Sequence, residues 1–300
     1  MGLVLKNVSK TFVGKRAVDN ISFELNKPGV FGLLGTNGAG KTTTIRMLLG
    51  IIKKDSGEIT WNGKVVDRKS VNFGYLPEER GLYKSMKVGE QCLYLAQMKG
   101  LSKAEAKKQL EYWFDKLDIK GWWNKKIEEL SKGMAQKIQF VVTVLHQPKL
   151  LIFDEPFSGF DPVNANLIKD EILELREKGA TIIFSTHNMV TVEDLCENIS
   201  LVNKSRIVLQ GNVAEIRASH KTDTFSLQSA TQIVPDGFEL IEQLKKNNVY
   251  ECIIKKSHAD TNNELLAKLI KQAEIVSFQE ILPSMNDIFI ETVSGSSVGE

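Results

Sequence analysis

The sequence predicts an α/β protein with a mostly parallel central sheet, an antiparallel β subdomain, a helical insertion and a small C-terminal α+β domain. Apolar runs of strand length at Val30–Leu34, Leu150–Phe153 and Thr181–Ser185 alternate with helical segments, which is typical of a parallel sheet. After about residue 219 the pattern changes to short alternating segments. We therefore expect domains at residues 1–218 and 219–293, followed by a flexible tail at 294–300.

Composition limits the classes of protein that this chain can be. Hydrophobic residues make up 42% of the 300 residues and charged residues 25%, as in a globular protein. No apolar run approaches the ~20 residues that span a bilayer, and the N-terminus lacks an apolar signal core, so we expect the protein to stay inside the cell. Three cysteines far apart argue against a disulfide framework or a zinc site.

Charge is distributed unevenly along the chain. The overall net charge is +2, but residues 221–300 carry 7 basic and 12 acidic side chains, a net charge of −5 against +7 for residues 1–220. This contrast supports two different domains. We expect no nucleic-acid binding, because the net charge is small and the C-terminal part is acidic.

The N-terminal elements surround a glycine-rich loop. The strand Val30–Leu34 leads into this loop, and a helix follows over Thr43–Leu49, which Gly50 can end. Residues Ile59–Val66 predict a hairpin, because Asn62-Gly63 is the preferred type I′ turn pair. Antiparallel strands are therefore expected beside the loop.

A helical insertion is predicted at about residues 87–146. Its helices cover Glu90–Met98, Lys103–Leu117 and Lys132–His146, and Pro148 stops the last one. Beyond the strand Leu150–Phe153, Asp161 can cap a helix that begins with Pro162.

The C-terminal domain is predicted from a different alternation of elements. These are strands Thr224–Leu227, Tyr250–Lys255 and Ile275–Ile281, a helix Asn263–Gln272, and a short helix from Pro283.

The glycine-rich loop carries the strongest chemical signal. It matches GxxxxGK[ST] between a strand and a helix, which identifies a P-loop NTPase core. The backbone N–H groups of such a loop and the N-terminus of the helix that follows it bind phosphate. Lys41 is expected to reach the β/γ-phosphates, and the Thr42 hydroxyl is expected to bind Mg²⁺. We expect ATP and Mg²⁺ as cofactors. The nucleotide-binding set here is Gly35, Thr36, Asn37, Gly38, Ala39, Gly40, Lys41, Thr42 and Thr43.

Two carboxylates end the buried strand Leu150–Phe153. Ligands collect at the carboxyl ends of strands in α/β sheets, so Asp154 is expected to hold Mg²⁺. Glu155 is positioned to polarise the attacking water as a general base. The alternative for Glu155 is a solvated side chain at a strand end.

A third motif begins a helix at Leu130–Gln136, where Ser131 is a natural N-cap. Together with the two motifs above, this segment resembles the signature sequence of the nucleotide-binding subunits of ABC transporters. In that family, the signature of one subunit closes over the γ-phosphate held by the other. Lys132 and Met134 depart from the usual LSGGQ sequence and Ala135 follows directly after it, whereas Ser131 and Gly133 remain.

The resemblance implies roles for further residues. His187 matches the histidine that contacts the γ-phosphate, and Asp161 matches a loop that crosses the dimer interface, although it is also a plausible N-cap. Phe12 lies where the family stacks an aromatic ring on adenine, with core packing as the alternative. Glu78 stands in the position of the family's glutamine, where it retains an oxygen ligand for Mg²⁺ or water.

The resemblance also implies partners and a location. The segment Tyr75–Tyr83 and the C-terminal appendage are similar to exporter-type subunits associated with sodium, drug or antibiotic efflux. A transmembrane permease subunit and a second ATPase subunit, identical or different, are expected. The protein would lie in the cytoplasm, peripherally on the inner face of the membrane.

Two other functions fit the sequence less well. A soluble ABC ATPase acting on ribosomes or DNA is disfavoured by the single ATPase copy and the acidic C-terminal domain. A small-molecule kinase leaves Ser131, Gly133 and His187 unexplained. Three tryptophans of the insertion either pack its helices or line a groove for a membrane partner; these are Trp113, Trp122 and Trp123.

Overall fold

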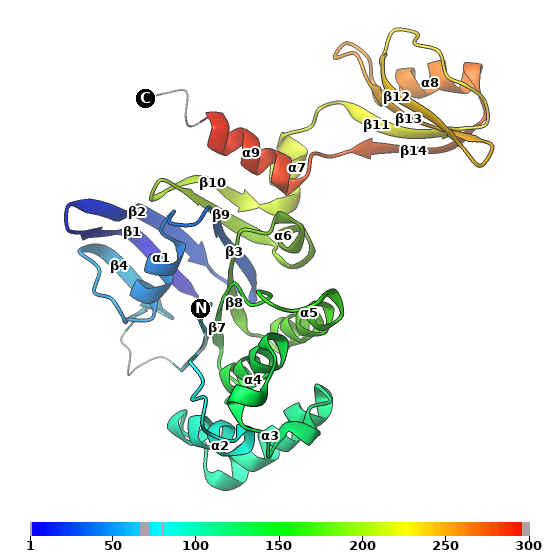
Figure 1. The fold of residues 1–300 in the computed structure, drawn as a ribbon. Helices are drawn as coiled ribbons and strands as arrows, with labels where there is room; N and C mark the ends of the chain where they lie inside the picture. Colours follow the sequence, from blue (N-terminus) through cyan, green and yellow to red (C-terminus); the bar gives the residue numbers. More distant parts are fainter. Residues whose placement is uncertain (1, 67–71, 80, 296–300) are drawn as a thin grey trace. The chain divides into compact units, whose positions relative to one another are not determined.

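The computed structural model describes residues 2–66, 72–79 and 81–295. The described chain divides into two compact units, residues 1–212 and 213–300 (Figure 1). Residues 213–218, which we expected in the N-terminal domain, form most of the first helix of the C-terminal unit, α7 (Val213–Ser219).

An antiparallel sheet with strand order β2-β1-β4-β5 begins the first unit. The predicted hairpin lies between its last two strands, where Asn62 and Gly63 have φ angles of 52° and 77°. Positive φ at both central residues is what a type I′ turn requires. The strands are β1 (Leu3–Phe12), β2 (Lys15–Leu25), β4 (Ser56–Trp61) and β5 (Lys64–Val65).

The mostly parallel sheet has the order β10-β9-β3-β8-β7-β6. Its neighbours are parallel except for β9 and β10, and every residue of β7 and β8 is buried. Two packed sheets and their helices confirm the predicted fold class. The strands are β3 (Gly29–Gly35), β6 (Phe73–Leu76), β7 (Leu150–Asp154), β8 (Thr181–Thr186), β9 (Asn198–Asn203) and β10 (Arg206–Asn212).

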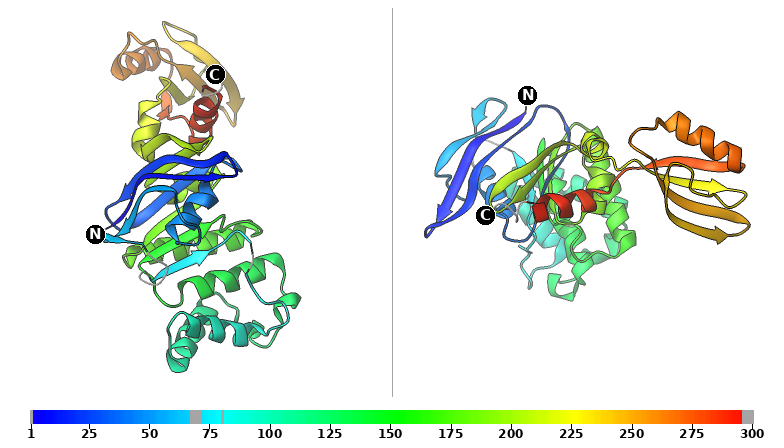
Figure 2. Two further views of the ribbon diagram at one scale, coloured as in Figure 1. Left: turned by 90° about the vertical axis from the view of Figure 1, so that its left-hand side faces the viewer. Right: turned by 90° about the horizontal axis from the view of Figure 1, so that it is seen from above.

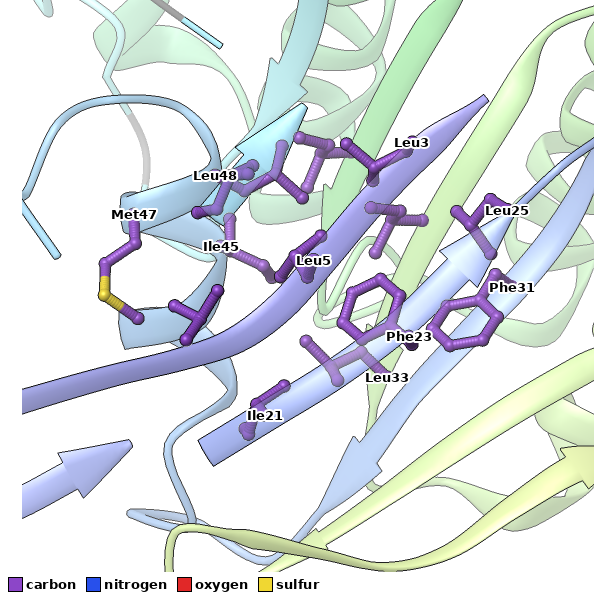
Figure 3. Close-up of a cluster of buried hydrophobic side chains, with 14 of the residues drawn as sticks. Leu3, Leu5, Ile21, Phe23, Leu25, Phe31, Leu33, Ile45, Met47 and Leu48 are labelled. Atoms are coloured by element: carbon purple, nitrogen blue, oxygen red, sulfur yellow. The ribbon is translucent and has the colours of Figure 1, made fainter. Parts of the chain in front are cut away.

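Helix α1 (Lys41–Leu48) packs between the two sheets. Its apolar side chains Ile45, Met47 and Leu48 meet Leu5 of β1 and Leu33 of β3 in one buried cluster (Figure 3). This packing fixes the helix and the loop before it. Two further helices of the α/β core are α5 (Pro162–Glu177) and α6 (Met189–Leu195).

The helical insertion follows β6. Trp113 packs edge to face against Phe140, with ring centroids 5.9 Å apart, and a Cβ on Gly89 would lie 2.3 Å from the Trp123 ring. The packing interpretation therefore applies to these two tryptophans. The helices are α2 (Val88–Met98), α3 (Lys103–Lys116), η1 (Lys120–Trp122), η2 (Ile127–Glu129) and α4 (Lys132–Val144).

The C-terminal unit contains an antiparallel sheet of order β12-β13-β11-β14, with α8 packed on one face (Figure 2). Helix α9 reaches Gly295, inside the stretch predicted as a tail, and residues 296–300 lie outside the described range. The elements after α7 are β11 (Thr224–Ser229), β12 (Glu239–Lys246), β13 (Val249–Lys255), α8 (Asn262–Gln272), β14 (Ile275–Ile281) and α9 (Met285–Gly295).

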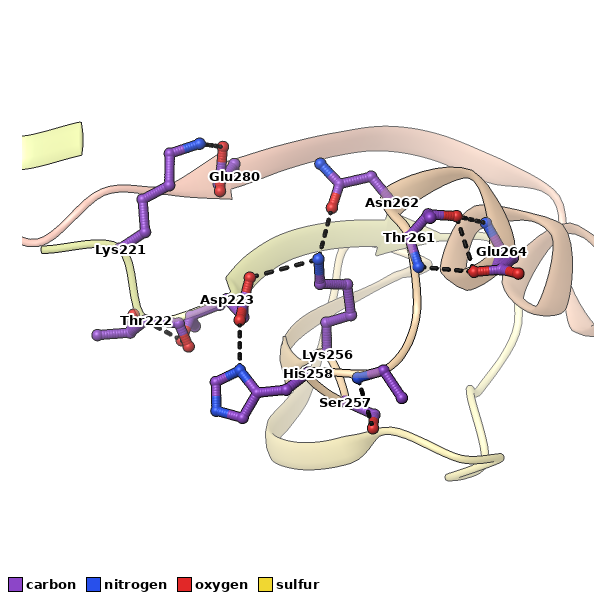
Figure 4. A network of polar contacts seen from close by, with 12 residues as sticks. Lys221, Thr222, Asp223, Lys256, Ser257, His258, Thr261, Asn262, Glu264 and Glu280 are labelled. Carbon is purple, nitrogen blue, oxygen red and sulfur yellow. Dashed lines mark hydrogen bonds and ion pairs between the residues drawn. The ribbon is translucent and has the colours of Figure 1, made fainter. Parts of the chain in front are cut away.

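A polar network joins the start of β11 to the end of β13 (Figure 4). Asp223 accepts hydrogen bonds from Lys256 Nζ at 3.3 Å and His258 Nδ1 at 2.9 Å. The same lysine donates to Asn262 at the start of α8, 3.1 Å away.

Among the described residues, no helix of either unit is long and apolar enough to cross a bilayer.

Candidate active site

The loop between β3 and α1 needs glycine at two positions. Gly35 and Gly40 have φ angles of 146° and 116°, in the region that side chains disfavour. A Cβ at Gly35 would lie 2.2 Å from the carbonyl oxygen of Val202, and one at Gly40 would lie 2.5 Å from that of Ala17. The loop is therefore held tightly against neighbouring backbone, with α1 beginning directly after it.

Lys41 places a buried cation inside this loop. Its side chain is 7% exposed, and Nζ donates to the carbonyl oxygens of Gly35 at 2.7 Å and Thr36 at 3.2 Å. Burial lowers the pKa of Lys41, while Glu155 and Asp154 act to raise it. The loop thus combines backbone N–H groups with an ammonium group, an arrangement that can bind a polyphosphate.

A cavity of about 290 Å³ lies over the loop. It brings Glu78, Asp154 and Glu155 together with the loop, as the sequence predicted, and adds Ala17. Gly35 lies at the end of β3, and Ala39 is buried beneath the loop. The cavity is lined by Ala17, Thr36, Asn37, Gly38, Gly40, Lys41, Thr42, Thr43, Glu78, Asp154 and Glu155.

Asp154 lies between two hydroxyl groups. The Ser185 hydroxyl donates to its Oδ1, and Thr42 Oγ1 donates to Oδ2 at 3.2 Å. Burial raises the pKa of Asp154, which is 1% exposed, although both hydroxyls act to lower it. Hydroxyl and carboxylate oxygens are the donors that Mg²⁺ prefers, so the residues present fit this ion.

Glu155 is held by the residues that end β8. Its backbone has a φ of 49°, and its Oε1 accepts from the backbone N of His187 at 3.0 Å and from His187 Nδ1 at 2.6 Å. The Thr186 hydroxyl donates to Oε2 at 3.2 Å. The side chain is 13% exposed, unlike a freely solvated glutamate at a strand end.

Comparisons with known proteins agree with this geometry. A family model described as ABC transporter matches residues 18–158, and one for the C-terminal domain of DrrA1-3-like ATP-binding proteins matches residues 211–293. The chain is 44% identical to the ABC transporter ATP-binding protein YhaQ of Bacillus subtilis, over 97% of this chain and 98% of YhaQ. The chain belongs to the ABC transporter ATP-binding proteins.

Further comparisons place it within this family. The linearmycin resistance ATP-binding protein LnrL of Bacillus subtilis is 31% identical over 96% of this chain and 97% of LnrL. A solved ATP-binding subunit of an ABC transporter superposes with a TM-score of 0.68 and 30% identity, covering 73% of this chain and 93% of that one. Proteins of this family hydrolyse ATP and work with transmembrane permease subunits, so this chain is an ATPase.

The signature segment of this ABC protein lines a second cavity, of about 380 Å³. Ser131 caps α4 by accepting from the backbone N of Met134 at 3.2 Å, and Gly133 lies beside it. Lys132 turns toward the loop before α5, where its Nζ is 3.4 Å from Ser158 Oγ. Among the residues that the structure describes, none lines both this cavity and the one over the P-loop.

Asp161 is the N-cap of α5 and also lines the signature cavity. It accepts from the backbone N of Val163 at 3.1 Å and of Asn164 at 3.0 Å, and these hydrogen bonds lower its pKa. The two readings of Asp161 from the sequence, helix cap and interface residue, are therefore compatible.

Phe12 ends β1 with a ring that is 42% exposed, which contradicts core packing. Lys10 Nζ lies 5.2 Å from the ring centroid. The ring remains available to stack on a planar ligand.

Sequence reasoning missed Ser185 and Thr186, the hydroxyls that hold the two carboxylates. A usable signal was present, because Ser185 and Thr186 are the last residues of a buried strand, before His187, and this strand ends beside the Asp-Glu pair in the same parallel sheet. It also missed Ala17, whose place in the cavity depends on how β2 approaches the loop.

Proposed function

We propose that this ATPase hydrolyses Mg-ATP at a site shared by two subunits and powers an exporter. The observation that carries the proposal is the cavity that gathers Lys41, Thr42, Asp154 and Glu155, with Glu155 anchored at the end of β8. The protein works on the cytoplasmic face of the membrane, through a permease subunit.

The reaction follows from the roles of these side chains. Lys41 and the loop N–H groups bind the phosphates, and Phe12 stacks on the adenine. Thr42 and Asp154, with Glu78 nearby, would hold Mg²⁺, which would neutralise charge on the phosphates. Glu155 accepts the proton of the attacking water, and the His187 ring, which hydrogen-bonds Glu155 in this structure, turns toward the γ-phosphate.

The separation of the two cavities supports a shared site. Ser131, Gly133 and Asp161 line a cavity apart from the P-loop of their own chain. The N-terminus of α4, with its capping serine, offers N–H groups to an anion. These groups complete the site of a second subunit, so ATP joins two subunits face to face.

Export is supported by relatives rather than by geometry. LnrL is named for resistance to linearmycin, and the DrrA1-3-like C-terminal domain is shared with ATP-binding proteins. Because resistance can result from removal of a compound from the cell, we propose export here. Cells that express the chain with its permease should tolerate more linearmycin than cells with the Glu155→Gln variant; equal or lower tolerance would argue against export of this compound.

The catalytic assignment is tested with Glu155→Gln. We expect ATP turnover to fall by about 10²- to 10⁴-fold, because the general base is lost. With Mg-ATP the variant should elute as a dimer in size exclusion, since bound ATP persists. Glu177→Gln, on the exposed end of α5, is the matched control. If Glu155→Gln hydrolysed ATP nearly as fast as the parent, the assignment of Glu155 as the general base would be wrong.

The shared site is tested by mixing two inactive variants. Lys41→Ala removes the phosphate-binding cation, and Ser131→Arg blocks the signature cavity. If each site uses Lys41 from one chain and Ser131 from the other, a mixed dimer retains one intact site, and mixing should restore part of the ATP turnover. No recovery at any ratio would contradict the shared arrangement.

A further inference from the structure

Thr186 is the last residue of β8 and is 3% exposed. Its hydroxyl makes two hydrogen bonds: it donates to Glu155 Oε2 at 3.2 Å and accepts from the backbone N of Asn188 at 3.1 Å. Asn188 is itself the N-cap of α6. The Thr186 proton is therefore directed at Glu155, because the N–H of Asn188 already occupies an acceptor position of the hydroxyl oxygen.

The two oxygens of Glu155 have different kinds of partner. Oε2 is bound by Thr186, which the sheet fixes, since Thr186 lies in register with Leu34 of β3. Oε1 is bound by the backbone and ring of His187, whose side chain is 63% exposed at the start of a loop. Thr186 is therefore a rigid partner, whereas the ring of His187 is free to turn away.

We propose that Thr186 is a positioning residue that anchors Oε2, so that Oε1 is the oxygen that accepts the proton of the attacking water. The inference rests on the proposed role of Glu155 as general base. When the His187 ring turns toward the phosphate, the backbone N of His187 still bonds Oε1, but the acceptor position that the ring held becomes available to water. Thr186 meanwhile keeps the carboxylate from rotating about its terminal torsion, which is otherwise soft.

The O–H bond of water breaks and its proton moves to Oε1 of Glu155. The water oxygen forms a bond to the γ-phosphorus, and the bond from that phosphorus to the bridging oxygen breaks. The electron pair leaves with ADP. Thr186 exchanges no proton in this step, because its hydrogen bond to Oε2 persists throughout.

The test compares Thr186→Val, which keeps the shape and loses the hydroxyl, with Thr186→Ser, which keeps the hydroxyl. A hydrogen bond to a charged group corresponds to about a 10- to 100-fold effect, so kcat of Thr186→Val should fall by that factor. The KM for ATP and the affinity for a fluorescent ATP analogue, measured without turnover, should stay near the parent values. Thr186→Ser should restore most of the kcat.

Two controls separate positioning from general damage. Thr181→Val makes the same change at the opposite, equally buried end of β8 and should leave kcat unchanged. In the Glu155→Gln background, Thr186→Val should cause little further loss, because the group that it positions is no longer a base. If circular dichroism shows that Thr186→Val does not fold, Thr186→Ala takes its place in the comparison with Thr186→Ser.

Several outcomes would overturn the proposal: a parental kcat in Thr186→Val, a serine variant as slow as the valine one, or full additivity with Glu155→Gln. A different outcome addresses the proposed function alone. If Glu155→Gln itself hydrolysed ATP at the parental rate, Glu155 would not be the base, whatever Thr186 does.

Discussion

The buried hydroxyl of Ser185 donates to Oδ1 of Asp154, and the two residues lie in register at the carboxyl ends of neighbouring parallel strands. With Oδ1 occupied, the other carboxylate oxygen faces Thr42. Partners behind a ligand orient it and strengthen metal binding. We therefore expect Ser185 to prepare Asp154 for Mg²⁺ without touching the ion.

Ser185→Ala should raise the Mg²⁺ concentration needed for half-maximal ATPase activity by about 10-fold, the lower end of such effects. A Mg²⁺ titration at saturating ATP measures this. Ser200→Ala is the control, because the Ser200 hydroxyl is equally buried but has no hydrogen-bond partner in the described part of the chain. An unchanged titration for Ser185→Ala would show that Asp154 needs no such support.

Lys41→Ala should weaken nucleotide binding before it affects chemistry. The variant removes a buried cation from the loop, and charge-assisted hydrogen bonds to phosphate correspond to about 10- to 100-fold in affinity. Titration with a fluorescent ATP analogue measures the loss. Lys53→Ala, on the surface beyond α1, should bind like the parent. Parental affinity in Lys41→Ala would place the phosphates elsewhere.

His146 should make the protein acid-sensitive. Burial lowers its pKa to about 4 from an ordinary value of 6.5, and Nε2 bonds to the carbonyl oxygen of Phe73 at 3.2 Å. Between these values the folded protein binds fewer protons than the unfolded chain, so the free energy of unfolding falls as pH drops from 6.5 to 4, by on the order of 3 kcal/mol in total.

The check on His146 is denaturant unfolding at pH 7 and pH 5. His146→Gln should lose less stability over this interval than the parent. If His146→Gln lost as much stability as the parent, the acid sensitivity would have another source.

Local signals explain which parts of the fold were predictable. The Asn62-Gly63 turn, the Asp161-Pro162 helix start and the apolar run of β7 depend on neighbouring residues only, and each is present. Strand β12 (Glu239–Lys246) was not predicted, because the spacing of Leu240, Ile241 and Leu244 also fits a helix. Its pairing with β13 decides its conformation.

The candidate site divides in the same way. The residues of the P-loop are contiguous in sequence, and so are the two residues of the Asp-Glu pair. The sequence alone therefore predicted each of these motifs and its chemistry. The hydroxyls of Ser185 and Thr186 lie 31 residues from the carboxylates that they hold. Only the register of β7 against β8 brings them together.

Glu78→Gln should keep substantial ATPase activity with an altered Mg²⁺ dependence. Glu78 lines the cavity over the P-loop, where an amide would retain an oxygen ligand, add a donor and remove a negative charge. ATP turnover across a Mg²⁺ titration measures the change, and Glu79→Gln, at the next position, is the control. Complete loss of turnover in a folded variant would show that the charge itself is required.

Coupling to the permease is expected at the segment that follows Glu78. The carbonyl oxygen of Glu79 accepts from Gln139 Nε2 at 3.3 Å, which ties this segment to α4 of the helical insertion. Arg80, on the same segment, is a further candidate for the contact but lies outside the described residues. Beyond it Leu82 is half-buried and Tyr83 is 56% exposed. An exposed aromatic on the segment that follows Glu78 suits a protein contact.

The backbone after Tyr83 is fixed to the insertion rather than to the sheet. Met86 accepts from the backbone N of Ile127, and Lys84 accepts from that of Glu128 at 3.1 Å. A change at Glu78 can therefore reach this surface and the insertion together. Coupling needs such a contiguous element whose position differs between nucleotide states.

Replacing both Leu82 and Tyr83 by Ala should leave the ATPase activity of the isolated protein nearly unchanged, because neither residue lines the nucleotide cavity. The same variant should co-sediment less with vesicles that carry the permease, and the permease should no longer stimulate its ATP turnover. Tyr94→Ala, which removes a similarly exposed tyrosine from α2, is the control. Normal binding and stimulation of the double variant would exclude this segment as the coupling surface, and Trp122, which lines the signature cavity, would be replaced next.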